Sequence, residues 1–171
     1  MPDLLVKLYT LPPVQPLIDA LAAEGFAIRR GIAAEKHVVV DWVAENFGKT
    51  WASETDIAYT RQPISCWVAT YDKRCAGFGC YDATAKGFFG PTGVDDTYRG
   101  KGLGKALLLA CLHDLRAQGY GYGIIGGAGP VDFYVRAVGA TVIPDSWPGV
   151  YEGMLRAGQS PSEEEDDGED E

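Results

Sequence analysis

Apolar residues recur at helical spacing in two long segments of the chain. In the segment AAEKHVVVDWVAENFG they fall at Val39, Trp42, Val43 and Phe47, and the glycine that follows is typical of a helix end. In residues 103–118 one face carries Leu103, Leu107, Ala110, Cys111 and Leu115. Shorter helices are predicted for VQPLIDALAAEG, for residues 51–60 and for PVDFYVRAVG.

The segments between these helices are short, apolar and bounded by turn residues, as strands are. Two of them, ISCWVATY and RCAGFGCY, are separated by Asp72 and Lys73, which predicts a hairpin. The other predicted strands are LLVKLYT, FAIRRG, KGFFGPTGV, YGYGIIGG, ATVI and VYEGML. Strands and helices in this mixed order predict an α/β (α+β) domain around one twisted sheet.

Length and composition fit one domain with a sizeable core. The chain has 171 residues, of which 46% are hydrophobic, and single cores commonly hold about 100 to 200 residues. We expect a strand and helix extension at 1–25, a main domain at 26–157 and an acidic, disordered tail at 158–171. No apolar run is long enough to span a bilayer and the first residues do not read as a secretory signal, so the expected location is cytoplasmic.

The net charge of −9 comes almost entirely from the tail. The final EEEDDGEDE holds eight acidic residues, which leaves 16 acids against 15 bases in the rest of the chain. Nucleic-acid binding normally needs a basic surface, so no nucleic-acid partner is expected. The four cysteines form no CxxC pair and the two histidines are not spaced with them as zinc ligands, which predicts reduced structural thiols and no metal.

The most distinctive motif is the glycine-rich stretch TYRGKGLGKALLLA at the start of the longest predicted helix. It lacks the first glycine and the hydroxyl residue of a triphosphate-binding P-loop, and its glycines are spaced by twos, unlike the dinucleotide motif G-x-G-x-x-G. A diphosphate group is the ligand that best fits this loop, because the glycines let backbone amides face inward and the helix contributes its positive end. Nearby cations add to this attraction. The cations are Arg99, Lys101 and Lys105.

This loop, followed by GAGPVDFYVRAVGA, resembles the GNAT acyltransferase superfamily. The resemblance implies a twisted mixed sheet of about seven strands flanked by helices, with two strands splayed apart to hold acetyl-CoA as the acyl-donor co-substrate. The residues that it places on the coenzyme are Thr92, Gly93, Val94, Arg99, Gly100, Lys101, Gly102, Leu103, Gly104 and Lys105.

The same resemblance implies a catalytic role for Tyr134, as the general acid that protonates the departing thiolate. Many members carry an asparagine seven residues earlier, where this chain has Gly127, and the backbone of GGAGP is a candidate substitute. For the general base the candidates are Glu54, ranked slightly first, Asp56, Asp82 or a chain of water molecules.

The acceptor is expected to lie against the predicted helices of residues 33–60, as the resemblance to the family implies. Their aromatic and acidic side chains favour a cationic amine, and Trp51 is the preferred binding residue, since Trp42 and Phe47 fit the core better. The chain is therefore predicted to be an N-acetyltransferase acting on a primary amine of a small molecule by direct attack in a ternary complex. Two alternatives remain: an acceptor that is an amino sugar or a peptide or protein amine, and a non-catalytic module that only binds CoA. A homodimer is compatible with the sequence.

Overall fold

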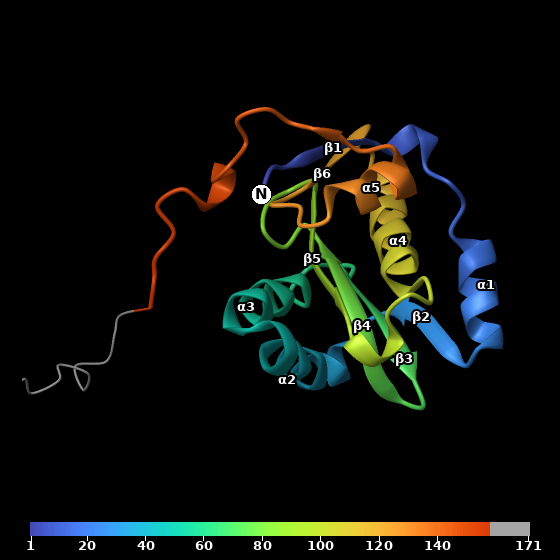
Figure 1. The fold of residues 1–171 in the computed structure, drawn as a ribbon. Helices are drawn as coiled ribbons and strands as arrows, with labels where there is room; N and C mark the ends of the chain where they lie inside the picture. Colours follow the sequence, from blue (N-terminus) through green and yellow to red (C-terminus); the bar gives the residue numbers. More distant parts are fainter. Residues whose placement is uncertain (158–171) are drawn as a thin grey trace, which may run out of the picture.

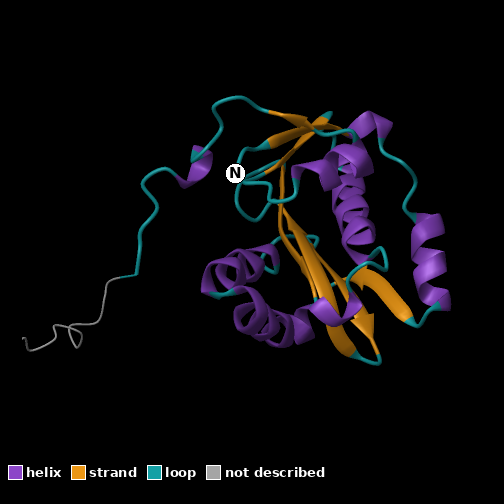
Figure 2. Cartoon of the chain, viewed as in Figure 1, coloured by secondary structure: helices purple, strands orange, loops and turns teal. Residues whose placement is uncertain are grey.

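The computed structural model describes residues 1–157, so the predicted acidic tail lies outside the described residues. Within residues 1–157, five α-helices and seven strands form the fold (Figures 1 and 2). The helices are α1 (Gln15–Ala23), α2 (Lys36–Phe47), α3 (Lys49–Ala58), α4 (Leu103–Ala117) and α5 (Val131–Val138). The strands are β1 (Leu4–Lys7), β2 (Phe26–Arg30), β3 (Cys66–Tyr71), β4 (Arg74–Tyr81), β5 (Phe88–Val94), β6 (Tyr122–Ile125) and β7 (Thr141–Val142).

All seven strands belong to one mixed sheet in the order β2-β3-β4-β5-β6-β1-β7. Only β5 and β6 run parallel, and every other neighbouring pair is antiparallel. The hairpin predicted between β3 and β4 is confirmed, because Asp72 and Lys73 both have positive φ, as its tight turn requires. The predicted α/β architecture and its strand count are confirmed.

The helices form two layers, one on each face of the sheet (Figure 1). Helices α1, α4 and α5 pack on one face, and α2 and α3 cover β3 and β4 on the other. The sequence pattern predicts a single apolar face for α4, but nine of its residues are buried. The reason is that α4 lies in the middle of its layer, where neighbours on several sides exclude water from it.

The N-terminal strand has a central place in the sheet. β1 lies between β6 and β7 and pairs antiparallel with both, so the segment expected as an extension at 1–25 contributes to the same sheet as the rest of the chain. The prediction of a strand at VYEGML is wrong. β1 occupies the position next to β6, and between β7 and residue 157 the chain leaves the sheet and forms only a 3-10 turn at Gly149–Tyr151.

Within residues 1–157, no helix combines the length and the hydropathy that crossing a membrane would require.

Candidate functional site

Strand β5 has one paired edge and one edge that is mostly open. It pairs with β4 as far as Val94, and the amide of Asp95 continues this ladder by donating to the carbonyl of Ala76 at 2.9 Å. Its pairing with β6 covers only Phe88 and Phe89. Beyond Phe89 the two parallel strands separate, which confirms the predicted splay.

The register of β4 and β5 determines which backbone groups face this gap. In an antiparallel ladder, hydrogen-bonded and non-bonded residue pairs alternate. Because Asp95 is bonded to Ala76, the pair Gly77–Val94 is non-bonded, Phe78–Gly93 is bonded and Gly79–Thr92 is non-bonded. The amides and carbonyls of Thr92 and Val94 therefore point away from β4 and into the gap, whereas the backbone of Gly93 is engaged with β4.

A bulge in β5 separates its paired part from its splayed part. The pairs Gly79–Thr92 and Tyr81–Phe89 enclose one more residue on β5 than on β4, as the glycine and proline of FFGPTGV predict. Gly90 has φ +125°, which an L-residue with a side chain rarely adopts. The bulge lies where β5 leaves β6, so it redirects the strand at the apex of the gap.

The glycine-rich loop lies at the start of α4. Gly100 and Gly102 have φ values of +79° and +98°, and Gly102 caps the helix, whose first backbone bond runs from the Ala106 amide to the Gly102 carbonyl at 3.0 Å. The amides of Leu103, Gly104 and Lys105 precede that bond and have no partner inside the helix. They provide a group of donors at the positive end of a 15-residue helix.

The three cations of this loop differ in their surroundings. The guanidinium of Arg99 lies 2.8 Å from Asp96, and the amine of Lys101 lies 3.6 Å from Glu24 at the end of α1. Both pairs are exposed, so they are weak and exchange readily with water or an anion. Within residues 1–157, Lys105 forms no ion pair and is the cation most available to a phosphate.

Tyr134 lies on α5 at the opposite end of the gap from this loop. Its side chain is buried, and its ring packs edge-on against Phe89 with 6.5 Å between centroids. Phe89 is the last residue of β5 that pairs with β6, so Tyr134 lies at the apex of the splay. Burial raises the pKa of Tyr134 to about 12, and its hydroxyl therefore keeps its proton at neutral pH.

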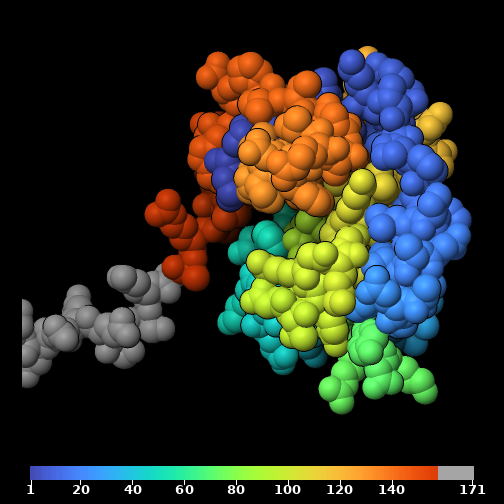
Figure 3. All heavy atoms as spheres, turned by 45° about the vertical axis from the view of Figure 1, so that its right-hand side comes forward, coloured from blue at the N-terminus to red at the C-terminus, as the bar shows by residue number. Residues whose placement is uncertain are grey.

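The surface is hollowed between these two parts of the site. Figure 3 shows a notch between the orange atoms of α5 and the yellow-green atoms of the segment that leads into α4. Tyr134 and the glycine-rich loop come from these two sides, and β5 connects them.

The glycines after β6 are held by the N-terminal residues. Asp3 Oδ1 accepts a hydrogen bond from the Gly127 amide at 2.8 Å, and the carbonyl of Pro2 accepts one from the Ala128 amide at 2.9 Å. The sequence predicts that the backbone of GGAGP takes the place of the missing asparagine, but three of its amides are already engaged within the chain, including that of Gly126, which donates to the Phe89 carbonyl at 3.4 Å. β1 brings Asp3 to this position, which no local pattern could reveal.

The aromatic residues of α2 and α3 pack together on β4 and β5. The Phe47 ring stacks on Trp51, with 5.5 Å between centroids and 23° between planes, and it covers the backbone of Gly93 so closely that a Cβ there would lie 2.5 Å from it. Trp42 packs edge-on against Phe47 and Phe78, as expected of a core residue. Trp51 is 37% exposed, so it presents a free ring edge beside the splayed strand.

The three candidate bases have different environments. Glu54 is partly buried on α3 and accepts hydrogen bonds from Thr84 and Tyr151 at 2.7 and 3.0 Å. Asp56 is engaged by Lys36 at 2.7 Å, and Asp82 is buried and accepts a bond from the amide of Gly87 at 2.7 Å. The last two carboxylates therefore have structural partners. No local pattern indicates a role for Thr84 or Tyr151, because only the tertiary fold brings them to Glu54.

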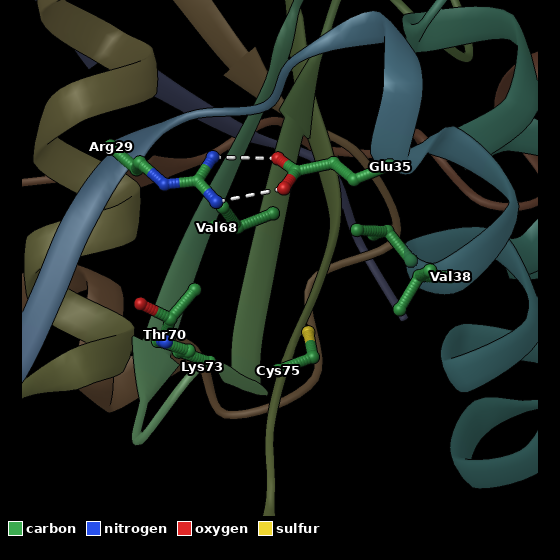
Figure 4. Close-up of a pocket in the computed structure, with 8 residues that line it drawn as sticks. Arg29, Glu35, Val38, Val68, Thr70, Lys73 and Cys75 are labelled. Atoms are coloured by element: carbon green, nitrogen blue, oxygen red, sulfur yellow. Dashed lines mark hydrogen bonds and ion pairs between the residues drawn. The ribbon is translucent and has the colours of Figure 1, made fainter.

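A separate hollow of about 390 Å³ lies near the β3–β4 hairpin (Figure 4). Figure 4 shows Arg29 of β2 and Glu35 at its upper rim, joined by two hydrogen bonds of 2.6 and 2.8 Å, with Cys75 and Lys73 below them. It contains none of the residues that the sequence predicts for the site. Burial raises the pKa of Cys75 to about 12, so this thiol is unreactive at neutral pH.

The remaining cysteines are also poor nucleophiles. All four are free thiols, and Cys66, Cys80 and Cys111 are buried. Burial raises the pKa of Cys111 well above its usual value. Among residues 1–157, no three His, Cys, Asp or Glu side chains gather in a way that could hold a metal ion.

Known structures resemble this fold over most of the chain. The GCN5-related glucosamine N-acetyltransferase region of a fungal multi-domain GH3 β-N-acetylglucosaminidase is 16% identical, with a TM-score of 0.67 over 83% of this chain and 19% of that one. A GCN5-related N-acetyltransferase from Sphaerobacter thermophilus is 22% identical, with a TM-score of 0.63 over 83% of this chain and 48% of its own. A GCN5-related N-acetyltransferase from Kribbella flavida is 16% identical, with a TM-score of 0.51 over 82% of this chain and 53% of its own.

These identities establish a shared fold, and the chain spans about half or less of the length of these proteins. No curated protein sequence matches it significantly. The model of the acetyltransferase (GNAT) family matches residues 36–139, from the first residue of α2 to the glycine that ends α5, and so includes the splayed strand, the glycine-rich loop and Tyr134. Because this match covers more than half of the sequence, the chain belongs to the acetyltransferase (GNAT) family.

Proposed function

We propose that the protein transfers an acetyl group from acetyl-CoA to a primary amine of a small molecule, with both substrates bound at once. The observation that carries this proposal is the open edge of β5. Its free backbone groups at Thr92 and Val94 lie between a phosphate-binding loop and a buried tyrosine. A site with a diphosphate cradle at one end and a proton donor at the other suits a long thioester.

The residues present fit coenzyme A. The free edge of β5 matches the amide groups of a pantetheine arm, and the amides at the start of α4 with Lys105 match a diphosphate. Gly100 leaves room for the phosphates, since no atom lies within 4 Å of the position that a Cβ would take there. When bound, acetyl-CoA supplies an activated acetyl group. Arg99 and Lys101 would exchange their exposed carboxylate partners for phosphate.

Tyr134 is proposed to donate a proton to the sulfur as the thioester bond breaks. Its raised pKa keeps the phenol protonated, and a thiolate is stabilised by a hydrogen bond from such a donor. Of the two amides that point into the gap, that of Thr92 lies nearer to Tyr134 along β5, and it is proposed to donate to the carbonyl oxygen as negative charge develops there. These donors come from opposite walls of the splay, which supports a reacting carbon between them.

The acceptor is proposed to bind on the side of α3. The exposed edge of Trp51 offers an aromatic surface for a cation, and Glu54 is the proposed base that takes a proton from the amine. Asp56 and Asp82 are weaker candidates, because each is paired with a lysine, whereas the partners of Glu54 are neutral hydroxyls. The same aromatic edge would also accept the apolar face of an amino sugar, which makes that compound class the second candidate.

The test is thiol release from acetyl-CoA with a panel of simple alkylamines, diamines, amino sugars and peptide amino termini. We expect turnover with at least one small primary amine, and the pattern across the panel separates the acceptor classes. If coenzyme A raises the melting temperature while no amine gives turnover, the protein is a CoA-binding module and the proposed activity is wrong. A protein that shows neither effect contradicts the coenzyme assignment itself.

A further inference from the structure

Three side chains from distant parts of the chain meet at Glu54. Thr84 Oγ1 and Tyr151 Oη both donate hydrogen bonds to Glu54 Oε1, at 2.7 and 3.0 Å, and the two hydroxyl oxygens lie 3.5 Å apart. Glu54 belongs to α3, Thr84 to the loop between β4 and β5, and Tyr151 to the turn after β7. A single carboxylate oxygen therefore joins three elements.

The second oxygen of Glu54, Oε2, has no such partners. Within residues 1–157, no side chain donates a hydrogen bond to it, and no lysine or arginine forms an ion pair with Glu54. The two hydroxyl donors are neutral, so they orient the carboxylate without cancelling its charge. A partly buried negative charge in this state favours a cationic ligand.

Glu54 lies close to the residues of α3 that border the splayed strand. Trp51 precedes Glu54 by three residues, and residues at this spacing are neighbours on a helix surface. Trp51 stacks on Phe47, whose ring covers the backbone of Gly93 in β5. Glu54 is thus one helical turn from an aromatic stack that rests on the strand with the open edge.

The segment after β7 reaches Glu54 from the other side of the gap. Ser146 Oγ accepts a hydrogen bond from the amide of Asp3 at 2.8 Å, and the ring of Trp147 lies 3.8 Å from where a Cβ on Gly127 would be. The turn at Gly149–Tyr151 then brings the Tyr151 hydroxyl to Glu54. Residues 146–151 therefore connect the end of β6 to α3, and Figure 1 shows this segment running to the side of the sheet where α3 lies.

We propose that Tyr151, together with Thr84, is a positioning residue of the acceptor site, and that it holds Glu54 so that Oε2 receives the ammonium group of the acceptor amine. This inference rests on the proposed amine acetylation. It adds that the acceptor is recognised as a cation before it loses its proton, and that the segment after β7 completes the site.

The positioning matters because a free glutamate side chain samples many rotamers. Fixing it before the substrate arrives removes part of the entropy cost of binding. A hydrogen bond to a charged group is among the stronger ones in a protein, so losing one donor should weaken amine recognition by about tenfold. The loss should spare acetyl-CoA, whose proposed contacts lie on β5 and at the start of α4.

The decisive variant is Tyr151→Phe, assayed with the amine of highest turnover in the panel. We expect the KM for the amine to rise about tenfold and the KM for acetyl-CoA to stay within about twofold. Thr84→Val should have the same effect, and Thr84→Ser, which restores the hydroxyl, should recover most of it. Tyr71→Phe is the matched control, since it removes a hydroxyl from the exposed end of β3.

A double-mutant cycle tests whether Tyr151 acts through Glu54. Adding Tyr151→Phe to Glu54→Gln should cause little further loss, because the carboxylate that Tyr151 positions is already gone. If the double variant loses as much activity as the product of the two single losses predicts, the positioning role is overturned. The same follows if Tyr151→Phe leaves the amine KM unchanged while the wild type turns over. In both cases the acetyltransferase proposal stands. A wild type that acetylates no amine contradicts both.

Amide hydrogen exchange supplies a readout that does not depend on turnover. In Tyr151→Phe and in Glu54→Ala, which remove the donor and the acceptor respectively, we expect faster exchange in residues 149–154, because the bond that fastens this turn to α3 is missing. Unchanged protection in both variants would show that Tyr151 does not hold the segment to Glu54, and the inference would fail at its structural step.

Discussion

The ring of Tyr134 packs edge-on against Phe89, the last residue through which β5 pairs with β6. The tyrosine is therefore fixed to the point at which the two parallel strands separate. A hydroxyl carried by a ring in this position keeps one orientation relative to the gap, because the centroid distance of 6.5 Å and the surrounding core leave the ring little freedom.

Replacing Tyr134 by phenylalanine should remove the proposed acid and preserve the fold. Within residues 1–157 the Tyr134 hydroxyl has no hydrogen-bond partner, so we expect the free energy of unfolding to change by less than about 1 kcal/mol. The kcat should fall by about 100-fold or more, as loss of a general acid does. Steady-state kinetics of thiol release measures this change.

Tyr122→Phe is the matched control for that variant, because Tyr122 is exposed at the opposite end of β6. It should leave kcat within about twofold of the wild type. Equal activity of Tyr134→Phe and Tyr122→Phe would eliminate Tyr134 as the acid.

Gly102→Glu should abolish coenzyme binding. It places a carboxylate at the start of α4, where the helix end and Lys105 favour an anion, and the like charges of carboxylate and diphosphate repel. We expect the increase in melting temperature caused by coenzyme A to disappear. Differential scanning fluorimetry with and without coenzyme A measures this.

Gly102→Ala separates charge from backbone strain in that experiment. Both variants place a side chain at a residue with φ of +98°, so both strain the backbone there. Alanine adds no charge, so coenzyme A should still raise the melting temperature of Gly102→Ala, by less than in the wild type. A full shift in Gly102→Glu would mean that the diphosphate binds elsewhere.

Gly93→Ala should disturb the aromatic surface beside β5. A Cβ on Gly93 would lie 2.5 to 2.9 Å from atoms of the Phe47 ring, so the ring and the stacked Trp51 must move. Overpacking of this kind costs about 1 to 3 kcal/mol of stability. Chemical unfolding followed by tryptophan fluorescence measures the stability.

Gly121→Ala serves as the reference for this substitution, since no atom lies within 4 Å of the Cβ it would add. It should unfold at nearly the same denaturant concentration as the wild type. Similar behaviour of the two variants would contradict the close packing of Phe47 on the strand.

Alkaline pH should destabilise the protein through Tyr134. An unfolded tyrosine loses its proton near pH 10, whereas burial raises the pKa of folded Tyr134 to about 12. The folded state therefore holds one more proton between these values, and its stability is complete below pH 10 and declines as the pH rises from 10 to 12. For a shift of two units the contribution is about 3 kcal/mol.

Urea unfolding of the wild type and Tyr134→Phe between pH 8 and 11 measures this contribution. The loss of stability above pH 10 should be smaller in Tyr134→Phe. Parallel curves for the two proteins would show that Tyr134 does not retain its proton in the folded state.

Local sequence patterns predicted most of the helices and strands and the motifs that they carry. Helical spacing located α2 and α4, Asp72 and Lys73 marked the hairpin, and the proline and glycine of FFGPTGV marked the bulge in β5. These features depend on residues close together in the chain, where periodicity and turn preferences act directly. The glycine-rich loop was also predicted from the sequence, because its glycines and the helix that follows them are contiguous in the chain.

The tertiary structure alone decided what depends on distant partners. The segment VYEGML has the composition of a strand, but β1 fills the place beside β6, so Tyr151 is free to reach Glu54. The amide of Gly127 is bound by Asp3 for the same reason. Local preference states only that a segment can pair, whereas the order of strands in the sheet decides with which partner it pairs, and that order placed the residues proposed to recognise the amine.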